Sequence, residues 1–377
     1  MDRRSFISKA IAFSVSSAGL LGGGIFAFLK EPKFGGTPAG SRLERIRRSP
    51  NFRDGSFQNQ LPTPVMTPVP GSRNAMLEFM FNRSKRLRPK GPVPSVRHNL
   101  RGLSPADNVL VWFGHSSYFL QVDGKRILVD PVLSGRASPV SFTTKAFEGT
   151  DPYTAADIPD IDVLFITHDH WDHLDYETVT KIRPRVKKVI CGLGVGAHLE
   201  KWGYAAAGIA EGDWGDSFAM GDGFTAHVLP ARHFSGRGLR RNATLWASYA
   251  LQTSSGRKIY LGGDGGYGPH FKEIGKQFGG FDLAVLENGQ YDKSWKLIHM
   301  MPRETLLAAH DLQSSLVFPV HNSKFCISNQ DWDAPLRSIT AIAAQMRVEL
   351  ITPVIGSVVE IGNPSGESSD WWTNLAC

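Results

Sequence analysis

The chain has 377 residues, of which 41% are hydrophobic and 20% charged, so it can bury a large core and is not a disordered polymer. Its three cysteines, Cys191, Cys326 and Cys377, show no paired spacing, which excludes a disulfide framework. The net charge of +7 comes from the N-terminal part: residues 30–101 carry 15 Lys+Arg against four acidic residues, and the chain beyond them has an acidic excess. A nucleic-acid enzyme would more often place positive charge around its catalytic body, so we expect no nucleic-acid partner.

The first 29 residues combine a short basic start with a long apolar run. Arg3-Arg4-Ser5-Phe6-Ile7 resembles a twin-arginine export signal. Ala10–Leu29 follows with 20 uncharged residues, enough for a helix to cross a bilayer. We interpret residues 1–29 as a signal-like or membrane-anchor segment that places the protein in the cell envelope, membrane-anchored or periplasmic. The pattern leaves open whether the segment is cleaved and on which side of the membrane the body lies.

Residues 30–104 are rich in Pro, Gly and Arg, and prolines 62, 64, 68 and 70 are spaced too closely for regular structure. We expect an extended basic arm that lies on the body or links it to a membrane, with a helical turn or more at 76–81. A solvated arm is the simplest interpretation of its charge, and attraction to anionic lipid headgroups is the alternative.

Short apolar runs and helix-like stretches then alternate along residues 105–365, which we interpret as one domain followed by a tail at 366–377. Buried strands are expected at 109–113, 118–122, 126–130, 163–167, 188–191, 224–229, 245–251, 258–261, 283–286 and 316–320. Helices are expected at 176–182, 196–202, 271–278, 302–312 and 334–346. This order predicts the α/β class, a mixed sheet sandwich with helices outside.

The most informative segment is Thr167–Asp175, in which two histidines, an aspartate and a third histidine follow a strand end. Neutral imidazole and carboxylate are suitable zinc donors. Alternate residues of an extended segment point the same way, so His168 and His170 can share one metal ion. Asp172 and His173 lie past a bend and can face a second ion about 3.5–4 Å away, the spacing that two-metal hydrolases use.

Two ions need more donors, and three candidates stand at separate strand ends. They are His233, Asp264 and His321. Taken singly, each would more often be structural. Taken together they complete two four-donor shells, namely His168, His170 and His233 with Asp264, and Asp172, His173 and His321 with the same Asp264. Each metal ion has four donors only if Asp264 bridges the two ions.

The order His-x-His-x-Asp-His, His, Gly-Asp-Gly, His resembles the metallo-β-lactamase superfamily. Over about residues 107–357 the chain is similar to N-acylphosphatidylethanolamine-hydrolysing phospholipase D and to bacterial RomA-like outer-membrane proteins. The matching stretches are Trp112–Ser117, Leu128–Pro131, His168–Asp175, Pro230–His233, Gly263–Tyr267, Glu273–Gly279 and Phe281–Ala284. The resemblance implies a four-layer αββα sandwich, two zinc ions and hydrolytic chemistry. Some true β-lactamases carry Cys or another pattern at the position of Asp264, so this aspartate argues against antibiotic hydrolysis.

The phospholipase-like branch implies hydrolysis of a lipid phosphodiester by a hydroxide that bridges the two metal ions. We expect Asp172 and His299 to be catalytic, with His299 assisting the leaving group or binding the phosphate, unless His299 is structural. His115 and Asp130 are expected to orient metal ligands. Three departures from the branch leave the natural substrate open: Gly265, Leu286–Gly289 and the Asn322-Ser323-Lys324 run after His321.

Two other functions stay open at this point. Related enzymes of this shape open lactones, so a lactonase or another small-molecule hydrolase is the main alternative. A non-catalytic envelope protein is the second alternative, although the complete set of ligands argues against it. The sequence gives no indication of oligomeric state.

Overall fold

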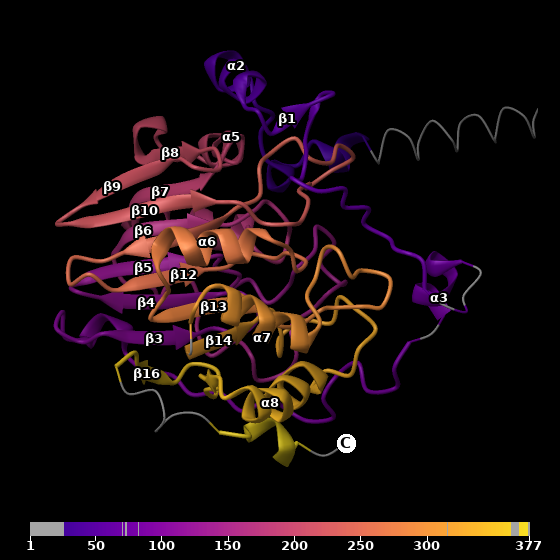
Figure 1. Cartoon of the computed structure of the whole chain (residues 1–377). Coiled ribbons are helices and arrows are strands. Elements are labelled where there is room, and N and C mark those ends of the chain that lie inside the picture. The colour runs from indigo at the N-terminus through magenta and orange to yellow at the C-terminus, as the bar shows by residue number, and fades with distance from the viewer. Residues whose placement is uncertain are drawn as a thin grey trace, which may run out of the picture.

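The strands of the body pair into two sheets that stack face to face (Figure 1). The computed structural model describes residues 26–69, 71, 74–81, 83–314, 316–362 and 369–375. Within these residues each of the two sheets has seven strands, and a separate two-stranded sheet lies in the N-terminal arm.

The first sheet has the order β16-β3-β4-β5-β6-β7-β8. Its strands are β3 (Val109–Trp112), β4 (Tyr118–Val122), β5 (Lys125–Val129), β6 (Ile161–Ile166), β7 (Val186–Gly192), β8 (Ile209–Gly212) and β16 (Val358–Glu360). Strands β5 to β8 are parallel neighbours, and the remaining pairs are antiparallel.

The second sheet repeats this plan with the order β15-β14-β13-β12-β11-β10-β9. Its strands are β9 (Ser217–Gly221), β10 (Phe224–Leu229), β11 (Ser248–Gln252), β12 (Lys258–Leu261), β13 (Leu283–Glu287), β14 (Leu316–Val320) and β15 (Glu349–Leu350). Strands β12 to β15 are parallel neighbours, whereas β9 to β12 alternate in direction.

The main core lies between the two sheets. Trp112 and Phe165 of the first sheet belong to the same buried cluster as Tyr249 and Phe318 of the second. Successive side chains of a strand point to opposite faces, so each inner strand also sends residues outward to a second apolar layer. These outward residues explain why the central strands are almost continuously apolar in sequence.

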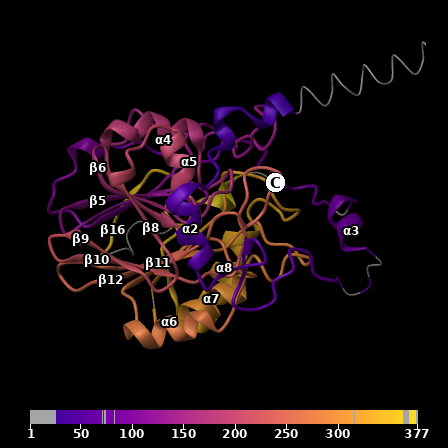
Figure 2. The same cartoon turned by 90° about the horizontal axis from the view of Figure 1, so that it is seen from above.

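Helices cover both outer faces and complete four layers (Figure 2). The first sheet is covered by α4 (Tyr176–Ile182) and α5 (Gly196–Lys201), and the second by α6 (His270–Phe278), α7 (Pro302–Asp311) and α8 (Ala334–Met346). Short 3-10 helices lie at Pro32–Phe34, Leu100–Gly102, Arg183–Arg185, Ala206–Gly208 and Trp371–Asn374. The predicted αββα sandwich is therefore confirmed.

Most predicted body elements are present, several with the same bounds, such as β4, β10 and α4. The strand expected at 245–251 begins later, at Ser248. Its apolar start, Leu245 and Trp246, belongs to a buried loop that packs against the arm. Apolar character there comes from tertiary packing and not from strand pairing.

The N-terminal arm contains more regular structure than its composition predicts. It forms α2 (Gly40–Arg48), β1 (Phe52–Arg53), β2 (Ser56–Phe57) and α3 (Ala75–Phe81). The expectation of an extended arm was wrong for residues 40–48, because the closely spaced prolines lie only at 62–70. Met76 to Phe81, where a turn or more was expected, lies within α3.

The arm packs on the body through charge and apolar contacts. Arg42 lies 2.8 Å from Glu200 Oε1 through Nη2 and 2.6 Å from Glu211 Oε2 through Nε. Ile46 and Phe57 are buried in a cluster with body residues. The segment that carries most of the positive charge is thus partly neutralised by the body that it covers.

The two predicted terminal segments differ in how much of each the structure describes. In the tail, Trp371 and Trp372 are buried in the main core, so its described part contributes to the domain. The twin-arginine motif and all but the last four residues of Ala10–Leu29 lie outside the described residues. Among the residues that the structure describes, no helix has the length and apolar character needed to cross a membrane.

Candidate metal centre

The predicted ligands meet at one edge of the sandwich because they follow strand ends. His233, Asp264 and His321 come after β10, β12 and β14 of the second sheet. β10 and β12 both pair antiparallel with β11, and β12 to β14 are parallel, so these three strands end at the same edge. The loop after β6 of the first sheet supplies the other four ligands to this edge.

The first cluster consists of His168, His170 and His233. His170 Nδ1 lies 2.9 Å from His168 Nε2 and 3.3 Å from His233 Nε2. Burial lowers the pKa of all three imidazoles, that of His170 to about 4, so they are neutral near pH 7. Three neutral rings that point nitrogen atoms at one another have lone pairs available for a shared cation.

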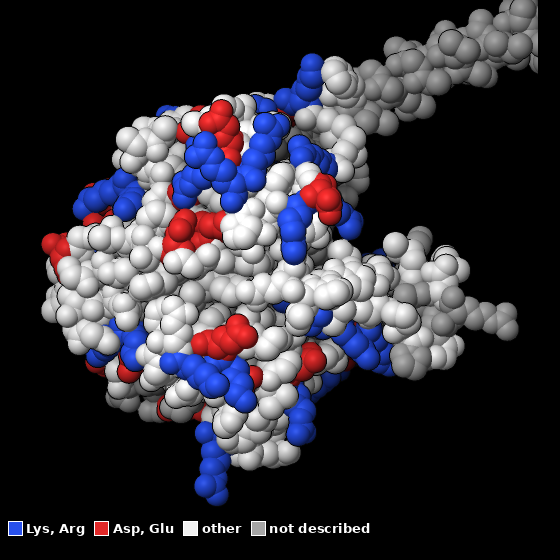
Figure 3. Space-filling model, turned by 45° about the horizontal axis from the view of Figure 1, so that its top comes forward, with Lys and Arg blue, Asp and Glu red and all other residues white. Residues whose placement is uncertain are grey.

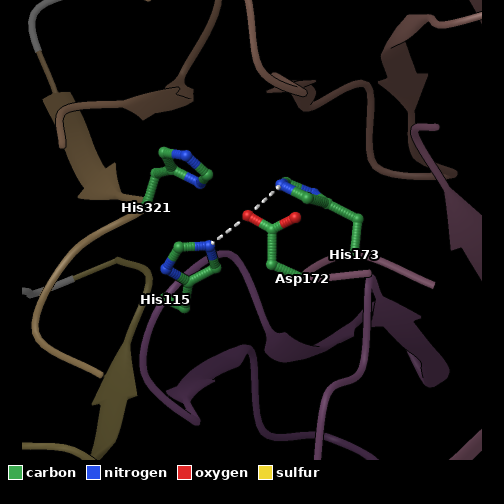
Figure 4. Close-up of side chains that lie close together, drawn as sticks. All are labelled: His115, Asp172, His173 and His321. Atoms are coloured by element: carbon green, nitrogen blue, oxygen red, sulfur yellow. Dashed lines mark hydrogen bonds and ion pairs between the residues drawn. The ribbon is translucent and has the colours of Figure 1, made fainter. Parts of the chain in front are cut away.

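The second cluster consists of His115, Asp172, His173 and His321, which converge in Figure 4. Asp172 Oδ2 lies 2.9 Å from His115 Nε2 and 3.7 Å from His173 Nε2. Sequence reasoning expected His115 to orient a ligand, and its ring does contact the ligand carboxylate. That role of His115 stays a prediction.

Asp264 lies between the two clusters with one oxygen facing each. Its Oδ1 lies 3.2 Å from His173 Nε2 and 3.1 Å from His321 Nδ1. Its Oδ2 lies 3.9 Å from His168 Nε2 and 3.8 Å from His233 Nε2. Burial raises the pKa of this carboxyl to about 6, although the adjacent His173 acts in the opposite direction.

Two buried atoms at the centre of the site fit a cation. His173 Nε2 and Asp264 Oδ1 lie 3.2 Å apart but form no hydrogen bond with each other or with another group, although buried polar atoms are nearly always satisfied. Cations that accept nitrogen and carboxylate donors would satisfy both atoms at once. The donor set of the described residues therefore suits metal ions.

Contacts outside the two clusters orient the imidazole rings. Asp130 Oδ2 lies 2.7 Å from His173 Nδ1, and Asp130 also accepts hydrogen bonds from the backbone and hydroxyl groups of Thr167. His233 Nδ1 donates to the Ile298 carbonyl at 2.9 Å. In each case a proton on Nδ1 leaves the Nε2 lone pair facing the cluster. Asp130 therefore contacts a predicted ligand, and its expected role in orienting that ligand stays a prediction.

A buried glutamate that sequence reasoning did not single out lies behind His299. Glu287 Oε2 lies 2.9 Å from His299 Nδ1, and Glu287 Oε1 accepts the Met300 amide at 2.5 Å. The His299 ring lies 5.2 Å from that of His233 and 5.3 Å from that of His321. Glu287 ends β13, so the strand-end rule that found Asp264 could also have found it.

The arm also contacts the metal centre, which no local sequence pattern indicated. The Asn59 side chain donates to the His233 carbonyl at 2.7 Å and accepts from the His233 amide at 3.1 Å. On the other side, buried Arg237 donates to the carbonyls of Lys33, Asp169 and Leu174. The arm therefore helps to hold the ligand loops in place through these hydrogen bonds.

Comparisons with known proteins agree with this geometry. A family model described as "Beta-lactamase superfamily domain" matches residues 125–322, more than half of the chain. A metallo-hydrolase of Ignicoccus hospitalis has a similar structure, with a TM-score of 0.50 at 20% identity over 67% of this chain and 98% of that one. A possible metal-dependent hydrolase of Veillonella parvula gives 0.54 at 15% identity over 68% and 100%. Fold and site together define a metal-dependent hydrolase of the metallo-β-lactamase fold.

The chain is also similar in sequence to several curated proteins. An uncharacterised protein of Mycobacterium tuberculosis is 37% identical over 89% of this chain and 92% of its own length. The outer membrane protein RomA of Klebsiella pneumoniae is 64% identical over 26% of this chain and 75% of its own. N-acyl-phosphatidylethanolamine-hydrolyzing phospholipase D 1 of Caenorhabditis elegans is 34% identical over 52% of this chain and 58% of its own. The chain belongs to the β-lactamase superfamily.

The Asn59 contact gives a first test. Asn59→Ala removes both hydrogen bonds to the His233 backbone, so we expect metal affinity to fall about tenfold or more, as for other residues that orient ligands. Asn51→Ala is the matched control, because Asn51 lies in the same arm but bonds Asp213. Chelator competition measures the affinity in both variants. Equal affinities for Asn59→Ala and Asn51→Ala would contradict a role for the arm at the metal centre.

Proposed function

We propose that the protein is a two-zinc hydrolase that cleaves a phosphodiester in a lipid headgroup, in the manner of a phospholipase D acting on N-acylphosphatidylethanolamine-like lipids. The observation that carries the two-metal part is the position of Asp264, which presents one oxygen to each histidine cluster. His168, His170 and His233 would hold one ion with Asp264. Asp172, His173 and His321 would hold the second ion with the other oxygen.

Two bound zinc ions would supply an activated water nucleophile and would polarise a phosphoryl oxygen. The protein determines the direction from which a substrate reaches them. Of the seven predicted ligands, His170 and Asp172 are partly exposed and the other five are buried. Trp171, between these two, is also partly exposed and contacts the ring of Phe34 at 5.2 Å. Substrate therefore approaches from the side of His170 and Asp172.

His299 is the proposed proton carrier for the leaving alcohol. Its Nδ1 contact with Glu287 holds the ring in one orientation, and the ring lies near both clusters. A proton held at Nδ1 by Glu287 leaves Nε2 to exchange a proton with the substrate oxygen. Asp172 would contribute as the partly exposed carboxylate ligand, positioned by His115.

The lipid part of the proposal rests on relatives. The Caenorhabditis elegans protein is named for hydrolysis of N-acylphosphatidylethanolamine and is 34% identical to this chain over 208 residues. RomA is named as an outer membrane protein, which supports envelope association for this chain. The apolar run at Ala10–Leu29 supports the same location.

Metal analysis of Asp264→Asn tests the two-ion site. The change keeps the side-chain shape but removes the charge that faces both clusters, so both ions should be weakened and zinc should fall well below two per chain. His233→Ala should weaken mainly one ion. Asp160→Asn, which alters an exposed carboxylate, is the control. Elemental analysis after dialysis in zinc buffer gives the counts. Full retention of zinc by Asp264→Asn would exclude a shared carboxylate.

Product analysis tests the substrate. Zinc-loaded full-length protein is incubated with N-acylphosphatidylethanolamine, other phospholipids and a panel of lactones. We expect phosphatidic acid and an alcohol without phosphate, and no product from Asp264→Asn prepared in parallel. Opening of lactones with all phosphodiester lipids intact would replace the lipid proposal by a lactonase. Zinc-loaded protein that acts on neither class would favour the non-catalytic envelope alternative.

A further inference from the structure

Helix α3 stands away from the body, at the side where the chain enters the described structure (Figures 1 and 2). Its side chains Met76, Leu77 and Phe81 are 53%, 52% and 77% exposed. Folded soluble proteins expose single apolar residues commonly but seldom group several on one projecting element. A surface of this kind indicates contact with an apolar partner.

The helix is attached to the part of the molecule that carries His299. The ring of Phe79 lies 4.6 Å from Trp295, and Asn329 donates to the Phe79 carbonyl. The Trp295 carbonyl accepts the His299 amide at 3.1 Å, and the two rings are 5.8 Å apart. Asn74 accepts hydrogen bonds from the first turn of α3 and so defines where the helix begins. A partner bound by α3 would therefore be connected to the metal centre through Trp295 and His299.

A second exposed apolar group lies where the described chain begins. Leu29 and Leu239 line one cavity of about 300 Å³ together with Asp169, which is part of the ligand loop. Leu239 is 88% exposed, and Phe26 is 61% exposed. The uncharged run of the sequence ends at Leu29, which lines this cavity.

Basic side chains lie at the foot of α3. In Figure 3 the white projection on the right has Lys and Arg atoms at its base. Four exposed basic residues belong to the segments next to α3 and Trp295, namely Arg83, Lys85, Lys293 and Lys296. The acids of this region are Glu78 in α3 and Asp292 next to Lys293. Exposed apolar residues with a basic excess favour an anionic lipid surface over a neutral or acidic protein.

We propose that α3 is a lipid-docking element of this protein. Met76, Leu77 and Phe81 enter the outer part of a leaflet, and the neighbouring Lys and Arg side chains contact anionic headgroups. Because α3 is anchored on Trp295, whose ring lies 5.8 Å from that of His299, docking presents the metal centre to the membrane surface. The link to lipid substrate rests on the proposed function, whereas docking itself does not need catalysis.

Insertion is tested by placing one reporter on α3. Full-length zinc-loaded Leu77→Trp protein is reconstituted with vesicles of phosphatidylethanolamine and phosphatidylglycerol that contain brominated chains, which quench tryptophan at the depth of the acyl region. Val96→Trp is the matched control, since Val96 is also an exposed apolar residue of the arm. We expect at least half of the added Leu77→Trp emission to be quenched and that of Val96→Trp to be unchanged. Equal quenching of both, or none at Leu77→Trp, would overturn the proposal.

A charge variant gives a second, independent readout. In Leu77→Glu/Phe81→Glu protein we expect vesicle lipid to be hydrolysed about tenfold more slowly, with the rate on a short-chain monomeric substrate unchanged. Equal loss on both substrates would overturn docking. If the wild-type protein hydrolyses no lipid, the proposed function fails while the quenching result still decides docking. A dimer that this double change separates, with no vesicle quenching, would identify a second copy of the chain as the partner of α3 instead.

Discussion

One buried carboxylate between two groups of imidazoles is the constraint on which the site depends. Asp264 faces His173 and His321 with one oxygen and His168 and His233 with the other. Burial raises the pKa of this carboxyl and lowers the pKa of His168 and His233, which face its Oδ2. Neither group can neutralise the other fully, so the arrangement is stabilised when cations occupy the space between them.

The fold explains how such distant residues meet. Parallel neighbours in both sheets end at one edge, where the loops after β6, β10, β12 and β14 supply the donors. The packed core between Phe165, Tyr249 and Phe318 holds the two sheets together, so the loops start from rigid positions. The arm adds further contacts to these loops. Asn59 hydrogen-bonds the His233 backbone, and the Lys33 carbonyl accepts hydrogen bonds from Arg237 beside the ligand loop. The N-terminal arm and the ligand loops are thereby connected through direct contacts.

Many of the strands and the seven candidate ligands could be predicted from the sequence, because the patterns that indicate them are local. The ligands His168 to His173 are close neighbours, and His233, Asp264 and His321 each follow an apolar run that became a strand. Helix α2 was missed because its one fully buried residue, Ile46, gives little apolar signal among charged residues. The contact of Asn59 with His233 spans 174 residues and has no local signature. Glu287 could have been found, since a glutamate at the end of a buried strand is costly without a partner.

The central claim is that Asp264 bridges two metal ions, and anomalous X-ray diffraction at the zinc edge tests it most directly. Crystals of the zinc-loaded full chain should show two peaks, one on each side of the Asp264 carboxylate. One should lie among His168, His170 and His233, and the other among Asp172, His173 and His321. A single peak, or two peaks that both lie away from Asp264, would contradict the account.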